Sequence, residues 1–169
     1  MNMIELFLAD LDHEAGRSTR ALEQVPGGKY DWKPHDKSMN FGYLAELVAT
    51  MPSWVTMAIA QDALDLNPQG GSTYKRPSLR TSSDLIEGHA TAVAAARAAL
   101  TGTTEAHLLT PWKLLVAGNV VMETPRHVVI SDTLRHLAHH RGQMTVYLRL
   151  LDATVPALYG PSADDKRFD

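Results

Sequence analysis

The chain has 169 residues, of which 44% are hydrophobic and 21% are charged, a composition typical of one globular domain spanning residues 1–169. Its net charge of -3 and the lack of a long Lys/Arg run argue against a nucleic acid or a membrane surface as partner, because both require concentrated positive charge. The sequence contains no cysteine, which excludes disulfides, thiolate metal ligands and a cysteine nucleophile.

The N-terminal residues carry acids where a signal peptide has a basic start, and no stretch reaches the ~18 uncharged apolar residues of a membrane span. We therefore expect a cytoplasmic protein. From about Met3 to Glu23, apolar residues recur at helical spacing and predict a first helix, which Pro26-Gly27-Gly28 should end. The stretch from Tyr30 to Met39 has no regular period, so we expect an ordered loop in which Trp32 plugs the end of a helix bundle.

A second helix is predicted from Asn40, a good N-cap, to about Asp62. Pro52 lies inside this pattern. Because an interior proline removes a hydrogen bond and clashes with the preceding turn, the helix should kink or break there. After a turn-rich connection at 67–77, Asp84 predicts the start of a third helix. His89 lies on its apolar stripe, and we interpret it as a hydrogen-bonded histidine at the edge of the core.

A short β-hairpin is predicted where two apolar runs flank Gly118-Asn119, with Trp112 anchoring it to the helices as a small flap. A fourth helix should begin with Thr124 as N-cap and Pro125 at its first position, and reach about Asp152. The tail beyond it is too rich in proline and glycine to be helical, and we expect it to fold back onto the helices. Four long helical patterns predict an all-α, up-down four-helix bundle.

The fourth helix carries the clearest functional signal. His136, His140, Gln143 and Tyr147 lie at spacings of three and four, which places them on one face beside the core-facing stripe. Two imidazoles at i and i+4 reach a common point, so His136 and His140 are candidate metal ligands. A helical His pair without a metal is also common, and that interpretation stays open. A glycine inside a helix is unfavourable, so Gly142 suggests that another helix or a ligand approaches closely there. The simpler interpretation is that it only permits close packing.

Four segments form a set that resembles the DinB/YfiT-like family of four-helix-bundle proteins. They are Trp32-Lys33-Pro34-His35-Asp36-Lys37-Ser38-Met39, Pro52-Ser53-Trp54, His136 to Gln143, and Tyr159-Gly160-Pro161-Ser162-Ala163-Asp164. The resemblance implies a divalent metal, often nickel or zinc, held by one His from the second helix and two from the fourth. The latter two would be His136 and His140. It also implies a homodimer formed through two helices and, in some relatives, thiol-dependent transferase or isomerase activity.

The family's first metal ligand does not carry over to this chain. By its spacing to Pro52 and Trp54, Leu47 occupies the position that the family fills with His, and leucine has no donor atom. Glu46 on the same helix, and Glu14 or His13 on the first helix, are the candidate replacements. Structural and catalytic zinc sites usually hold three or more protein ligands, so two histidines leave the site incomplete.

Two functional hypotheses follow. In the first, His136 and His140 hold a metal that activates a water or thiol, as in a metal-dependent thiol transferase or hydrolase acting on a small molecule, with Gln143 or Tyr147 in support. In the second, Leu47 marks a metal-free protein that binds a small molecule or serves as a dimeric scaffold.

Two further hypotheses are weaker. DNA processing conflicts with the charge balance of the chain. A triad of Ser131, Asp132 and His136 conflicts with the adjacency of the first two on one helix, because the acid must lie behind the imidazole and the serine in front. We therefore assign no catalytic residue from the sequence.

Overall fold

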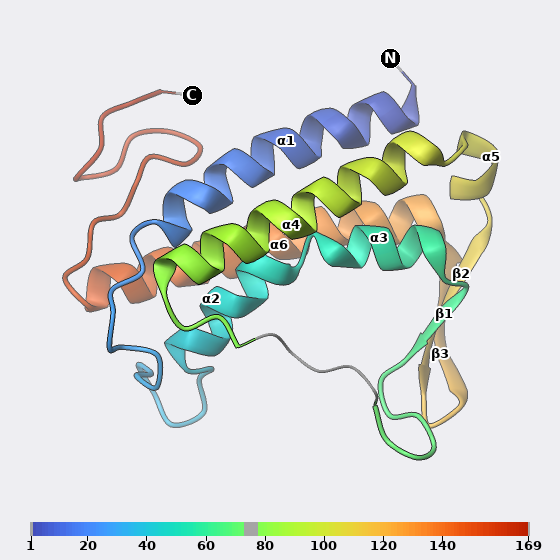
Figure 1. The fold of residues 1–169 in the computed structure, drawn as a ribbon, viewed down its shortest axis with the longest axis horizontal. Coiled ribbons are helices and arrows are strands. Elements are labelled where there is room, and N and C mark those ends of the chain that lie inside the picture. Colours follow the sequence, from blue (N-terminus) through green and yellow to red (C-terminus); the bar gives the residue numbers. More distant parts are fainter. Residues whose placement is uncertain (1, 73–77, 169) are drawn as a thin grey trace.

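The computed structural model describes residues 2–72 and 78–168, and within them the chain is mostly helical with a small three-stranded sheet at one end (Figure 1). The helices are α1 (Met3–Leu22), α2 (Phe41–Thr50), α3 (Ser53–Ala60), α4 (Ser82–Gly102), α5 (Glu105–Leu108) and α6 (Arg126–Leu150). The strands are β1 (Ala63–Asp65), β2 (Pro111–Val116) and β3 (Asn119–Pro125). The predicted long helical patterns are confirmed as α1, the α2–α3 pair, α4 and α6.

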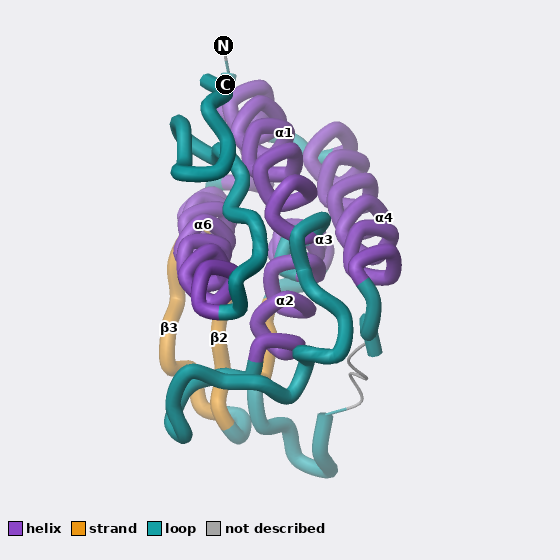
Figure 2. Tube along the Cα trace, turned by 90° about the vertical axis from the view of Figure 1, so that its left-hand side faces the viewer, coloured by secondary structure: helices purple, strands orange, loops and turns teal. Residues whose placement is uncertain are grey.

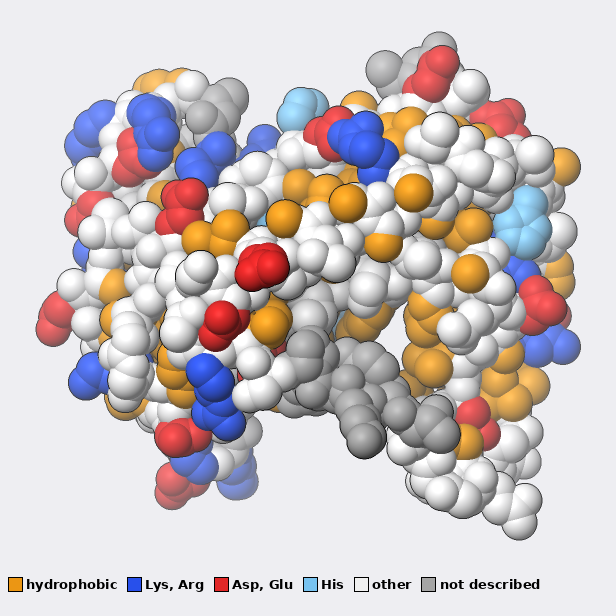
Figure 3. All heavy atoms as spheres, viewed as in Figure 1, with side chains coloured by type: hydrophobic (Ala, Val, Ile, Leu, Met, Phe, Trp, Pro, Cys, Tyr) orange, Lys and Arg blue, Asp and Glu red, His pale blue; other side chains and the backbone are white. Residues whose placement is uncertain are grey.

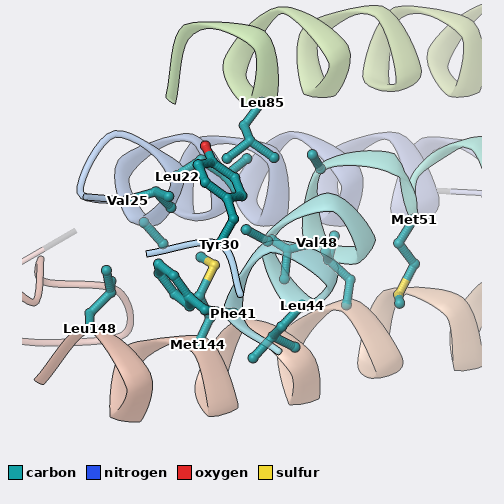
Figure 4. Packing of buried hydrophobic residues seen from close by; sticks show 14 residues of the cluster. Leu22, Val25, Tyr30, Phe41, Leu44, Val48, Met51, Leu85, Met144 and Leu148 are labelled. Carbon is teal, nitrogen blue, oxygen red and sulfur yellow. The ribbon is translucent and has the colours of Figure 1, made fainter. Parts of the chain in front are cut away.

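The helices enclose two apolar clusters. Both α4 and α6 pack against α1, α2 and α3, and Figure 2 shows α4 and α6 on opposite sides of the others. The larger cluster lies toward the loop before α2, where side chains from α2, α4 and α6 meet (Figure 4). The smaller cluster lies toward the sheet and includes Phe7, Leu11 and Ile130. Apolar residues thus line the inner faces of the helices along their length.

The predicted break at Pro52 is confirmed. α2 ends at Thr50 and α3 begins at Ser53, and the two axes bend by 50°. The Ser53 hydroxyl donates to the carbonyl oxygen of Thr50 (2.7 Å), which offsets part of the lost backbone bonding. No single described helix is long and apolar enough to cross a membrane, and only the bent α2–α3 pair taken together reaches that length and composition.

Two predicted helix starts were wrong by one to three residues. α4 begins earlier than Asp84, because Thr81 is the N-cap and Asp84 closes a capping box with it, each side chain accepting the other residue's N–H (3.0 Å both ways). α6 begins after Pro125 because Thr124 and Pro125 pair with β2 in the sheet. The predicted connection at 67–77 lies partly outside the described residues.

The sheet contains one strand that the sequence did not predict. β1 pairs in parallel with β2, and β2 pairs antiparallel with β3. The predicted hairpin and its buried anchor Trp112 are confirmed, but the turn uses Ala117 and Gly118, with φ of 50° and 79°. The carboxylate of Asp65 accepts the N–H groups of Ala117 (3.0 Å) and Gly118 (2.7 Å), so the end of β1 holds the hairpin turn.

The C-terminal tail folds back on the helices, as predicted. Arg17 and Arg20 on α1 donate through Nε to the carbonyl oxygens of Leu158 (3.0 Å) and Ala157 (3.1 Å). Tyr159 donates its hydroxyl hydrogen to Glu14 (2.9 Å). The tail therefore packs along α1 at the end of the molecule opposite the sheet (Figure 1).

Candidate functional site

The middle of α6 brings the two predicted histidines together. The Nε2 atoms of His136 and His140 lie 2.8 Å apart, and Nδ1 of His140 lies 2.8 Å from Oε1 of Gln143. An amide oxygen only accepts, so Nδ1 of His140 carries the hydrogen and its Nε2 presents a lone pair. His136 then donates from Nε2 to that lone pair. Both Nε2 atoms therefore point at one place, as the spacing of four residues predicts.

The surroundings of the pair favour neutral imidazoles. His136 is exposed, whereas His140 is buried. Burial lowers the pKa of His140, the hydrogen bond to Gln143 raises it, and the charges of His136 and His139 lower it again, with a net result below the ordinary value. His136 is exposed overall, but the partial desolvation of its ring, and then the charge of His139, also lower its pKa. The neutral ring is the form that binds a metal or accepts a proton.

Aromatic side chains border this face of α6. The Trp54 ring on α3 meets His136 edge-on, with centroids 5.6 Å apart. Tyr147, two turns beyond His140, packs edge-on against Trp32 (5.5 Å) and donates its hydroxyl to the carbonyl oxygen of Met39 (3.3 Å). Trp32 thus covers one end of the helices, as predicted. Tyr147 holds the loop before α2, whereas Gln143 supports His140.

The family's third ligand position offers no donor in this chain. Leu47 is partly buried and packs against the larger apolar cluster. Glu46 accepts the N–H of Leu79 through Oε1 (3.2 Å) and lines a surface pocket of about 310 Å³ with Tyr30 and Arg80. Glu46 is therefore engaged with the segment before α4 and does not replace the missing histidine.

The candidate replacements on α1 do not join the pair either: Glu14 is engaged elsewhere, and His13 lies in a pocket that the pair does not line. Glu14 binds Arg141, Arg17 and the hydroxyl of Tyr159. Burial raises the pKa of Glu14, but these partners together hold it below its ordinary value. His13 and Glu14 line a second surface pocket of about 280 Å³ between α1 and α6. Neither this pocket nor the first is lined by the histidine pair.

The donor set provides two ligands where the family resemblance implies three. Across residues 2–72 and 78–168, no three His, Asp or Glu side chains are grouped closely enough to hold one ion. Two nitrogens bound to one tetrahedral zinc ion lie about 3.3 Å apart, so the two rings would need to separate only slightly, and His136 would need to carry its hydrogen on Nδ1 instead of Nε2. The site therefore fits a metal as a pair of ligands with open positions, and it does not fit the complete three-histidine site.

The other polar candidates have structural partners. The ring nitrogens of His89 face the carbonyl oxygens of Ala49 (3.1 Å) and Ala15 (3.3 Å), which confirms its interpretation as a bonded core histidine. Asp132 pairs with Arg135 (3.0 Å), and Ser131 lines the pocket between α1 and α6. The structure thus does not assemble a Ser131–Asp132–His136 triad.

Sequence reasoning missed two features of the site. One is the contact of Trp54 with His136, for which the Pro52-Ser53-Trp54 motif was the available signal. The other is the network of buried Arg141 on α6, Glu14 on α1 and exposed Tyr159 in the tail, which no local spacing could indicate. Both depend on contacts between separate elements.

Comparisons with known proteins agree with this fold. A profile of the DinB family matches residues 1–167. A DinB-like protein from Bacillus cereus ATCC 10987 superposes with a TM-score of 0.71 at 21% identity, covering 92% of this chain and 97% of that one. The DinB-like protein YjoA from Bacillus subtilis superposes with a TM-score of 0.68 at 17% identity, covering 95% of this chain and 99% of that one. At these identities the likeness shows the fold alone.

The uncharacterized protein YrdA from Bacillus subtilis (strain 168) is 40% identical over 43 residues, which are 25% of this chain and 26% of YrdA. The chain thus covers about a quarter of the length of that curated relative. The family profile, in contrast, extends over nearly the whole sequence. The chain therefore belongs to the DinB family.

Proposed function

We propose that His136 and His140 form a two-ligand centre for a divalent metal, nickel or zinc, in a protein that acts on a small molecule as a thiol transferase or hydrolase. The observation that carries this proposal is the convergence of the two Nε2 atoms, 2.8 Å apart, with Gln143 behind His140. A divalent cation held there would lower the pKa of a coordinated water or thiol and make a nucleophile near neutral pH.

The chain's own residues prepare the site in three ways. Gln143 fixes the tautomer of His140, so that its Nε2 lone pair faces the common point. Burial keeps the imidazole of His140 neutral. Trp54 forms an apolar wall beside His136. With only two protein ligands, at least two positions of a tetrahedral ion would be open to water or substrate atoms.

The test is calorimetric titration of the metal-free protein with Zn²⁺ and Ni²⁺. Losing a residue that merely supports a ligand typically costs about 10–100-fold in metal affinity, so His136→Ala and His140→Ala should each cost at least that much. His127→Ala is the matched control, since His127 lies on the same helix more than two turns before the pair and its ring faces the carbonyl oxygen of Leu108 (3.2 Å), and it should leave the affinity within about twofold. No binding by the natural protein, or an equal loss in His127→Ala, would refute the metal centre.

The activity has its own test. The metal-loaded protein should accelerate the transfer of a low-molecular-weight thiol to an electrophile, or the hydrolysis of a small ester or amide. Removal of the metal by a chelator, or His140→Ala, should abolish the acceleration. A rate that survives both changes would show that the chemistry lies elsewhere.

The alternative function, a metal-free protein that binds a small molecule or serves as a scaffold, is favoured by Leu47. This side chain adds to the apolar packing of α2 where a ligand would be needed. Leu47→His separates the two functions. Tight metal binding that appears only in the variant would show that the natural chain has lost its site. Equal affinity in both proteins would exclude the metal-free alternative.

We also propose that the helices form the family's up-down four-helix bundle and that the chain forms a homodimer through two helices. Val146 and Leu150, one turn apart on α6, are 58% and 56% exposed, which supports a helical interface. On the face drawn in Figure 3, charges of both signs are interspersed, which does not suggest nucleic acid binding.

The dimer is tested by light scattering after gel filtration. Val146→Glu combined with Leu150→Lys should convert the dimer to a monomer. Val121→Lys on the exposed hairpin is the control, and it should remain dimeric. A monomeric natural protein, or a dimer that only the hairpin variant disrupts, would contradict an interface made by helices.

A further inference from the structure

The side chains of His136 and His140 differ in how firmly their surroundings fix them. His140 is buried, and its Nδ1 is fixed by Gln143. His136 is exposed, and its only described hydrogen bond is the one to His140. An exposed histidine ordinarily exchanges between staggered rotamers, and most of these would move Nε2 of His136 away from its partner. The convergence of the pair therefore depends on whatever restrains His136.

Trp54 is placed to supply that restraint. Among the described residues, its indole makes the only aromatic-ring contact with His136 that comes from outside α6. The indole is itself partly buried against the larger apolar cluster. It reaches α6 because the chain bends by 50° at Pro52, and the backbone N–H of Trp54 donates to the carbonyl oxygen of Met51 (2.9 Å) across that break.

We propose that Trp54 is the positioning residue that holds His136 in the rotamer facing His140. This inference rests on the proposed role of the histidine pair. Edge-on aromatic contacts of this kind bias a population about two- to tenfold. The bend at Pro52 thus has a function at the site, because it brings the Trp54 ring on α3 into contact with His136, the less restrained of the two histidines.

The test measures the side-chain rotamer of His136 in the metal-free protein at about pH 8, above the ordinary histidine pKa of about 6.5. Three-bond couplings from the backbone nitrogen and carbonyl carbon to Cγ report χ1 by NMR. The natural protein should show one rotamer for both His136 and His140. Trp54→Ala should average the couplings of His136 alone, and Trp54→Phe should restore them. Trp32→Phe, which alters a tryptophan packed on Tyr147, should leave both unchanged.

A single rotamer of His136 in a folded Trp54→Ala protein would overturn the proposal, and so would rotamer averaging of His136 in the natural protein. Zinc titration provides the second readout, in which Trp54→Ala should weaken binding about two- to tenfold and Trp54→Phe should recover it. If the natural protein binds no zinc, the metal centre fails while the rotamer result still decides the role of Trp54.

Discussion

Buried His89 lies where three helices meet. From its position on α4, its two nitrogens face carbonyl oxygens of α2 and α1, and the single N–H of the neutral ring donates to one of them. Burial lowers its pKa, the carbonyls of Ala49 and Ala15 raise it, and the charge of Arg141 lowers it, with the net value below the ordinary one. The side chain is therefore neutral in the folded protein near neutral pH.

This shift predicts the pH dependence of stability. The unfolded chain, with a histidine pKa of about 6.5, binds more protons than the folded chain, so the free energy of unfolding is highest above about pH 6.5. It should fall as the pH decreases through the lowered pKa of His89, and His136 and His140 shift in the same direction. Urea unfolding between about pH 7.5 and 5 measures the free energy of unfolding. This range lies above the ordinary carboxylate pKa values, so the histidines dominate the change.

His89→Gln is the matched variant, since glutamine keeps polar atoms but does not titrate. It should reduce the dependence of the unfolding free energy on pH, whatever its effect on absolute stability. A natural protein equally stable across that range would show that the three histidines are not shifted as described.

Two glycines make a second test at the scale of single residues. A Cβ on Gly42 would lie 2.5 Å from Cδ1 and 2.9 Å from Cβ of Tyr30, whereas a Cβ on Gly142 would meet nothing within 4 Å. Neither another helix nor close packing therefore accounts for Gly142 in the described chain, and the alternative of an approaching ligand stays a prediction. Gly42→Ala should destabilise by about 1–3 kcal/mol through overpacking. Gly142→Ala should stabilise by about 0.5–1 kcal/mol through helix propensity.

Thermal unfolding of both glycine variants decides this prediction. The pair is informative because the substitution is the same and both glycines lie in helices. An equal shift in the two variants would mean that the backbone near Tyr30 relaxes to accept the added methyl group.

At the scale of elements, the sheet is organised by β1 and its terminal carboxylate. Asp65 accepts two N–H groups from the hairpin turn and a third from Asn67 (2.9 Å). Ala117 has a positive φ, a conformation that non-glycine residues rarely adopt. The carboxylate thus stabilises a turn whose backbone is unfavourable on its own.

Replacing Asp65 tests this arrangement. Asp65→Ala should cost about 1–2 kcal/mol, because it removes charge-assisted hydrogen bonds at an exposed site. Amide hydrogen exchange should speed up at Ala117 and Gly118, which donate to the carboxylate. Asn67→Ala is the control, since it removes a side chain but keeps the N–H that bonds to Asp65. Unchanged exchange at the turn in Asp65→Ala would contradict the role of the carboxylate.

At the scale of the whole molecule, an ion pair with a buried arginine joins the first helix, α1, to the last helix, α6. Arg141 on α6 is fully buried and donates to Glu14 and to the Ser18 hydroxyl (3.0 Å) on α1. Tyr159 from the tail shares this network and stacks under Arg17, whose Cζ lies 4.2 Å from the ring centroid. A buried arginine is costly unless each of its partners is in place. The tail therefore completes the packing of α1 on α6.

Tyr159→Phe removes one hydroxyl from this network and keeps the ring. The unfolding free energy should fall by about 1–2 kcal/mol, the cost of leaving a buried charged group less well bonded. Limited proteolysis should cut the tail faster. Phe168→Ala, at a side chain that is 83% exposed, should change neither quantity. Equal stability of Tyr159→Phe and the natural protein would show that the Tyr159 hydroxyl does not stabilise the buried ion pair.

Local patterns in the sequence were sufficient for features decided within one element. The helical periods, the Asn40 cap, the break at Pro52 and the convergence of His136 with His140 all depend on spacings of a few residues, which the backbone geometry of a single helix determines. Membership of the DinB family was likewise indicated by motifs in the sequence.

Only the tertiary structure decided which faces of separate elements meet. It paired the short β1 with β2, turned Trp54 toward His136, and engaged Glu46 and Glu14 with partners other than the histidine pair. None of these contacts has a local period, because each depends on the packing of segments far apart in the sequence. Two ligands could thus be assigned from one helix, whereas the absence of a third among the described residues emerged only when the helices were packed together.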